Sequence, residues 1–193
     1  MGLAILILGL VVFLGAHVFV TFRDDRARMI ERLGMGGYRA LFAFNSLVGL
    51  ALIVWGYANY RAHGWVQIWT PPQFMRHITV GLMVLSVIFF TAAFIPSHIK
   101  TRLRHPMLAG VKTWAFAHLL SNGDLGSMLL FGSFLAWGVY ARIAAKRRGD
   151  LGAAMAPSGW GNDVIVVALG IVIYFALGFA FHPIVIGVPV FNG

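Results

Sequence analysis

Long apolar segments separated by short polar ones dominate the chain. Each approaches the roughly 20 residues that an α-helix needs to cross about 30 Å of hydrocarbon. The pattern predicts an all-α, polytopic bundle of six membrane spans in a single domain, residues 1–193, with spans at residues 2–22, 39–60, 77–97, 106–121, 125–144 and 163–184. The fourth is short for a full crossing, so we expect it to be tilted or to stop before the far surface.

Basic residues follow only some of these spans. All but two of the fifteen lysines and arginines lie around the connections after the first, third and fifth spans, and only Arg61 and Arg76 lie on the other side. The positive-inside rule therefore places these three connections in the cytoplasm and both termini on the non-cytoplasmic side. The first run has no basic segment before it and continues without a cleavage pattern to Arg23, so it is expected to be a membrane helix and not a cleaved signal.

The composition agrees with a membrane protein. Hydrophobic residues make up 60% of the chain and charged residues 11%, and the mean hydropathy is +0.83. The net charge of +9 does not indicate nucleic acid, because the basic residues flank apolar runs. The bilayer is thus the first expected partner. The chain has no cysteine, which excludes disulfides and thiolate metal sites.

Two of the seven histidines are predicted to lie at membrane depth. His17 stands about six residues, or roughly 9 Å, inside the basic edge of the first span, and His118 about six residues beyond Lys112. An imidazole in lipid needs a hydrogen bond, a proton path or a metal. The plainest alternative is an interhelical hydrogen bond. A histidine near a membrane surface is usually solvated. This position is predicted for the other five histidines, which are His63, His77, His98, His105 and His182.

Two buried histidines on different helices fit a haem, which needs axial nitrogen ligands, an apolar slot and cations near its propionates. Trp114 and Asn122 share a helix face with His118, where Trp114 would flank a flat ring and Asn122 would orient the imidazole. Phe13 and Thr21 flank His17 in the same way, and Arg39 is a candidate to meet a carboxylate. Spacing alone favours ordinary helix packing. In upright spans the two histidines would lie at different depths, so a shared haem would require a tilt.

Other chemistry has little support in the sequence. No acidic residue is predicted at mid-membrane, which argues against a proton-coupled carboxylate relay. The P-loop, GxGxxG and HExxH patterns do not occur. Asp124 is expected to cap the fifth span through its carboxylate. Asn45 and Ser46 are expected to join helices and not to form a site.

Several motifs together resemble the NnrU family. The most specific are Arg104-His105-Pro106-Met107, then Trp114, then Ala117-His118-Leu119-Leu120-Ser121-Asn122-Gly123-Asp124. The similarity extends over nearly the whole chain, from His17 through Gly37-Tyr38-Arg39, Arg76-His77 and Trp137 to His182-Pro183.

The resemblance implies a bacterial inner-membrane protein linked to the expression or activity of nitrite and nitric oxide reductases in denitrification. The plant 15-cis-zeta-carotene isomerases, of the same superfamily, use haem b to isomerise a polyene. Their haem-ligating histidines match His17 and His118, and His105 and His182 match supporting positions. Where they carry a cysteine, one turn before the second ligand, this chain has Ala115. A thiolate ligand switch is therefore not available to it.

Three functions are compatible with these observations. The first is a haem b protein with His17 and His118 as axial ligands, acting beside denitrification reductases. The second is a haem-dependent isomerase of a membrane-soluble polyene such as a carotenoid. The third is a cofactor-free assembly or scaffold protein in which the histidines only join helices. The sequence does not determine the substrate or the oligomeric state.

Overall fold

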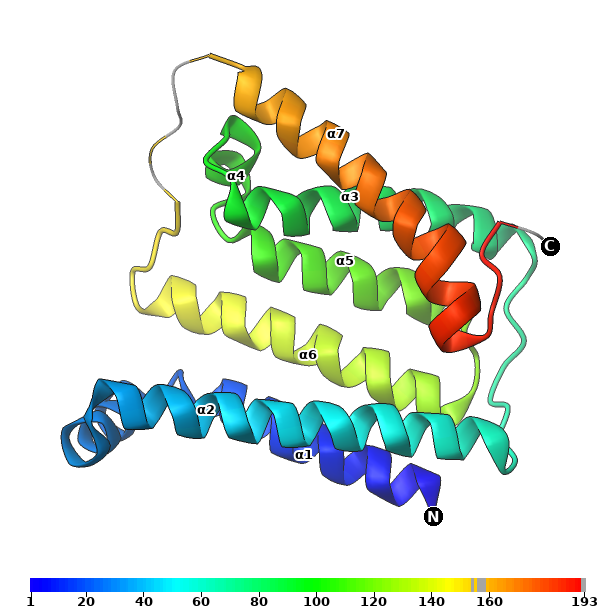
Figure 1. Ribbon diagram of the computed structural model, residues 1–193, viewed down its shortest axis with the longest axis horizontal. Helices are drawn as coiled ribbons and strands as arrows, with labels where there is room; N and C mark the ends of the chain where they lie inside the picture. The colour runs from blue at the N-terminus through cyan, green and yellow to red at the C-terminus, as the bar shows by residue number, and fades with distance from the viewer. Residues whose placement is uncertain (154, 156–158, 192–193) are drawn as a thin grey trace. The chain divides into compact units, whose positions relative to one another are not determined.

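A computed structural model describes residues 1–153, 155 and 159–191 as helices joined by connecting segments (Figure 1). The helices are α1 (Gly2–Phe19), α2 (Arg23–Ala62), α3 (Phe74–Phe94), α4 (His98–Leu103), α5 (Pro106–Ser121), α6 (Leu125–Arg147), α7 (Gly161–Ala176) and the π-helix η1 (Leu177–Ile186). In these residues the only β-type pairing is an isolated bridge from Gln67 to Asp124. The all-α prediction is confirmed for this part of the chain.

In the described part of the chain, five helices are long and apolar enough to cross a membrane: α1, α2, α3, α6 and the continuous segment Gly161–Ile186. The predicted fourth span corresponds to α5, which has only 16 residues. At about 1.5 Å per residue it is shorter than the hydrocarbon thickness. A sixth crossing and the orientation of the termini remain predictions.

The segment before the second span is helical, where the sequence analysis predicted a connection up to residue 39. Helix α2 begins at Arg23 and bends at Gly34, which has φ 69° and ψ 162°. Glycine adopts positive φ without the steric cost of a Cβ atom. A polar helix of residues 23–33 therefore precedes the apolar part of α2.

The chain forms two compact units. The first comprises Met1–Thr70 and Asn122–Ala144, and the second Pro71–Ser121 and Ala145–Gly193. Each unit contains one of the two histidines predicted at membrane depth.

In the first unit, α1 and α2 pack antiparallel with their backbones close together. Gly2 and Gly9 on α1 and Gly49 and Gly56 on α2 lie at this contact, each pair seven residues apart. A Cβ atom on Gly56 would lie 2.3 Å from the backbone nitrogen of Leu6. Small residues allow this close approach, which is common between membrane helices.

Helix α6 joins this pair through polar contacts near both ends. The Tyr57 hydroxyl lies 2.7 Å from the Ser127 hydroxyl, and the Thr21 hydroxyl lies 2.8 Å from that of Tyr140. Before α6, Asp124 is 1% exposed and its carboxylate accepts the Ser127 backbone N–H at 2.9 Å. The Arg61 guanidinium lies 3.7 Å from the same carboxylate. The prediction that Asp124 caps this helix is confirmed.

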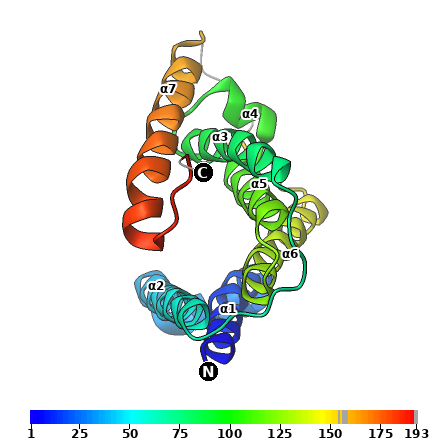
Figure 2. The same cartoon turned by 90° about the vertical axis from the view of Figure 1, so that its right-hand side faces the viewer.

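In the second unit, α3 lies between α5 and α7 (Figure 2). The Ser86 hydroxyl donates to the Gly110 carbonyl at 2.9 Å, and the Thr79 hydroxyl donates to the Ala117 carbonyl at 2.8 Å. Tyr174 of α7 donates to the Val80 carbonyl at 3.3 Å. Buried hydroxyls thus join α3 to both neighbours. Two hydroxyls of α3 donate to carbonyls of α5, and the Tyr174 hydroxyl of α7 donates to a carbonyl of α3.

Asp163, in the first turn of α7, connects that helix to the start of α4. Its carboxylate accepts the backbone N–H groups of His98 and Ile99 and lies 2.8 Å from His98 Nδ1. The carboxylate therefore occupies the N-terminal donors of α4, which would otherwise lack partners.

Candidate functional site

His17 lies on α1 and is partly buried in the first unit. Its Nδ1 lies 2.7 Å from the carbonyl oxygen of Phe13, one turn earlier. A carbonyl only accepts hydrogen bonds, so Nδ1 carries the hydrogen. In the neutral ring the lone pair is then on Nε2, the nitrogen that remains for a metal or a proton donor.

Aromatic rings from α1, α2 and α6 surround this imidazole. The ring centroid of Phe13 lies 4.3 Å from that of His17, that of Phe42 5.1 Å, and that of Trp137 5.6 Å at 89°. Trp137 Nε1 is buried and has no hydrogen-bond partner among the described residues. Phe13 thus lies beside His17 as its spacing predicted, whereas Thr21 instead binds the carbonyl of Val18 and the hydroxyl of Tyr140.

The aromatic row continues from Phe42 to a buried tyrosine and an arginine. The rings of Tyr38 and Phe42 are 6.5 Å apart, and the guanidinium carbon of Arg26 lies 5.2 Å from the Tyr38 centroid. Neither Arg26 nor Tyr38 was expected from the sequence to contact a cofactor. Arg39, the basic residue that it did select, is exposed, and its contact with a cofactor carboxylate remains a prediction.

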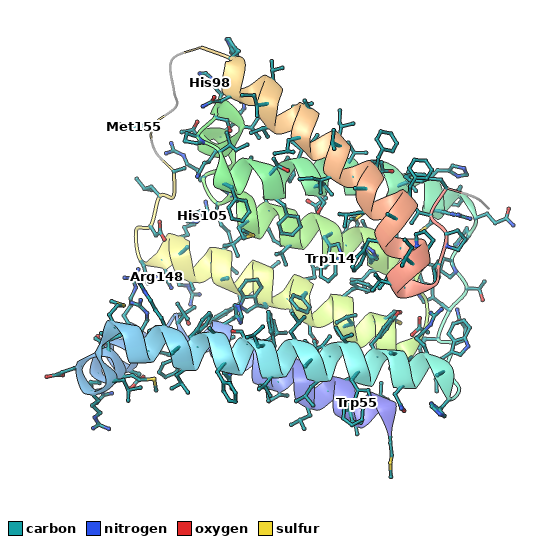
Figure 3. All side chains as sticks on the ribbon, viewed as in Figure 1. Trp55, His98, His105, Trp114, Arg148 and Met155 are labelled. Carbon is teal, nitrogen blue, oxygen red and sulfur yellow. The ribbon has the colours of Figure 1, made fainter. Side chains whose placement is uncertain are left out.

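His118 lies on α5 in the second unit and repeats the arrangement of His17. Its Nδ1 lies 2.9 Å from the carbonyl oxygen of Trp114, one turn earlier on the same helix. Figure 3 labels Trp114 on α5. The Trp114 ring centroid is 5.5 Å from the imidazole. The predicted pairing of Trp114 with His118 on one helix face is therefore present.

A second imidazole lies next to His118. The ring centroids of His118 and His182 are 6.4 Å apart, and their planes differ by 21°. His182 Nδ1 lies 3.1 Å from the carbonyl oxygen of Leu177, five residues earlier. The structure thus brings His182, a residue expected near the membrane surface, beside the partly buried His118 of α5.

The π-helix η1 positions His182. Pro183 lacks an N–H group and its ring would clash with the preceding turn of an α-helix. The wider turns of a π-helix accommodate this residue, and such turns are frequent at functional sites. The hydrophobic pattern predicted an ordinary span here, although His182-Pro183 was a signal that the helix changes.

The remaining predicted residues have different surroundings. His105 Nε2 lies 3.2 Å from the carbonyl oxygen of Asp150 and 3.9 Å from its carboxylate, so His105 holds the segment that follows α6. Asn122 directly follows α5 and belongs to the first unit. Among the described residues, no group of three or more histidine or acidic side chains is arranged to hold a metal ion. A haem would need only its axial ligands.

The apolar helices define the class of the protein, an α-helical membrane protein with histidines among its apolar segments. The family model described as NnrU protein matches residues 5–190, so the chain belongs to the NnrU family. No curated protein and no solved structure matches the chain.

Proposed function

We propose that this NnrU-family protein resides in the bacterial inner membrane, binds haem b and supports denitrification through nitrite or nitric oxide reductases. His17 and His118 are the proposed axial ligands. One observation supports this most: both imidazoles donate Nδ1–H to the carbonyl one turn earlier. Histidines that bind metals typically hold their second nitrogen in such a hydrogen bond, which sets the tautomer and the ring orientation.

The surroundings of each histidine fit a haem ligand. His17 is enclosed by aromatic rings, and His118 has Trp114 and His182 beside it. The carbonyl contact by itself does not identify a haem ligand, because the exposed His63 makes the same contact. Its Nδ1 lies 3.0 Å from the carbonyl oxygen of Asn59. A bound haem would supply one-electron redox chemistry. The residues of the chain would orient the imidazoles and keep water from the iron.

The test is an absorption spectrum of the detergent-purified protein, oxidised and then reduced with dithionite. We expect a Soret band with sharp reduced α and β bands and close to one haem per chain. His17→Ala and His118→Ala should each abolish or shift these bands. His63→Ala is the matched control, because it removes an imidazole with the same carbonyl contact from an exposed position.

The possible outcomes separate haem ligation from a scaffold role. If neither variant alters the spectrum, the ligand assignment is wrong. If the protein purifies without haem after expression with ample haem, the scaffold function is favoured. A scaffold should also tolerate asparagine at positions 17 and 118, since an amide still forms hydrogen bonds.

A second candidate is a haem-dependent cis–trans isomerase of a membrane-soluble polyene. The observation that favours it is a shallow groove along α7 and η1 whose side chains are all apolar, among them Leu177, Phe181 and Ile184. Leu177 also provides the carbonyl that His182 contacts. Membranes that contain the protein should convert an added cis-carotenoid under reducing or oxidising conditions. Absence of product under both conditions would exclude this activity for that substrate.

A further inference from the structure

The helix that precedes the kink in α2 places one of its arginines inward. Residues 23–33 contain four arginines, and three of them are exposed: Arg23, Arg28 and Arg32. Arg26 is partly buried and shares a face with Met29 and Ile30, which are three and four residues away. An arginine on the apolar face of an amphipathic helix requires a specific partner.

The inward arginine has no acidic partner in the described part of the chain. The nearby Asp25 carboxylate pairs with the exposed Arg28. Arg26 lies over the ring of Tyr38, and its Nε is buried without a hydrogen-bond partner. The cation–π contact stabilises the charge but does not satisfy the N–H groups, which donate in the guanidinium plane.

Tyr38 has the same deficiency. This residue is 6% exposed, and its hydroxyl is buried without a hydrogen-bond partner. Leaving a buried donor unpaired is costly, and more so when it is charged. Two such groups on adjoining side chains are best explained by an acceptor that carries negative charge.

The position of this pair indicates the kind of molecule that carries the acceptor. Ring separations of 6.5 Å from Tyr38 to Phe42 and 5.1 Å from Phe42 to His17 connect the pair to the candidate ligand. The occupant should therefore combine a flat apolar body beside His17 with an anionic group at its edge. A haem has this form, with two carboxylates on one side of an apolar macrocycle.

We infer that Arg26 and Tyr38 form a carboxylate-binding subsite for a haem propionate, at the end of the aromatic row that begins at His17. This inference rests on the proposed haem function. It assigns the propionate contact to the arginine that the fold turns inward, whereas the sequence pointed to Arg39.

The test compares haem with haem dimethyl ester, which has no free carboxylate. Apoprotein in detergent is titrated with each compound, and binding is followed by the Soret band. The wild-type protein should prefer haem by about tenfold or more, as expected for a charge-assisted hydrogen bond. Arg26→Gln should remove most of this preference, Tyr38→Phe part of it, and Arg26→Lys less than Arg26→Gln. Arg32→Gln is the matched control, because it removes an exposed arginine of the same helix.

Two results would overturn the inference while leaving haem binding intact. The first is an unchanged preference for haem in both Arg26→Gln and Tyr38→Phe. The second is that cardiolipin raises the unfolding temperature of the wild type but not of Arg26→Gln, while Arg26→Gln keeps the preference of the wild type for haem. This result would assign the subsite to a lipid phosphate. If the wild type binds neither compound, the proposed function itself fails and the propionate assignment fails with it. Should Arg26→Gln not fold, the Arg26→Lys and Tyr38→Phe titrations decide.

Discussion

The two units pack their helices in different ways. In the first, α1 and α2 approach through glycines such as Gly9 and Gly56, which bring the two backbones close together. In the second, α3 contacts α5 through the hydroxyls of Ser86 and Thr79, which donate to carbonyls of the facing helix. Lipid does not drive helices together as water does, so close packing and hydrogen bonds must do so. The α1–α2 contact should therefore be sensitive to added volume, and the α3–α5 contact to the loss of single hydrogen bonds.

The candidate ligands show a parallel contrast. His17 and His118 have the same local contact with the carbonyl four residues earlier, because that contact depends only on the helix. Their neighbours differ. Phenylalanine and tryptophan rings surround His17, whereas a second imidazole, that of His182, lies beside His118. Equivalent local geometry thus occurs in two different chemical surroundings.

The largest effect is expected from added volume in the first unit. Gly56→Ala places a Cβ atom 2.3 Å from the Leu6 nitrogen, so the α1 and α2 backbones must move apart. We expect a loss of about 2–3 kcal/mol in stability, typical of overpacking. Thermal unfolding in detergent, followed by the fluorescence of the six tryptophans, measures it. Gly132→Ala is the control, because a Cβ there meets nothing within 4 Å. Equal unfolding temperatures for the two variants would contradict the close glycine contact.

A smaller effect is expected from removing the cap of α6. Asp124→Ala leaves the Ser127 N–H without its acceptor and Arg61 without its nearby carboxylate. The expected cost is about 2 kcal/mol, from the lost cap and ion pair together. Asp124→Asn should retain much of the stability, since asparagine is also a good N-cap. If Asn is as damaging as Ala, the charge matters more than the cap.

The smallest effects are expected for the hydroxyls of the second unit. Ser86→Ala or Thr79→Val removes one interhelical hydrogen bond, and each should cost about 0.5–1 kcal/mol in the same unfolding measurement. Thr91→Val is the control, because the Thr91 hydroxyl donates to Val87 within its own helix. A cost for Thr91→Val as large as for Thr79→Val would show that hydroxyls do not join these helices.

Much of the fold was predictable, because the length of an apolar run is a local property. The five long apolar helices, the short α5 and the role of Asp124 all agree with the sequence analysis. The helix from Arg23 to the kink was missed, since its polar composition is typical of a connection. The π-helix at His182 was missed because one proline does not specify how the surrounding turns widen.

The sequence by itself determined the helical class with its long apolar segments and the family, and it gave the prediction that two histidines lie at membrane depth. Hydrophobicity and sequence motifs are read directly from the order of residues, and the hydrogen bond from an imidazole to the carbonyl one turn earlier follows from helix geometry alone. Only the tertiary structure decided that Arg26 is the inward-facing arginine, that Phe42 and Trp137 lie beside His17, and that His182 lies beside His118. Those contacts join residues far apart in sequence or across a kink, so they depend on how helices bend and pack.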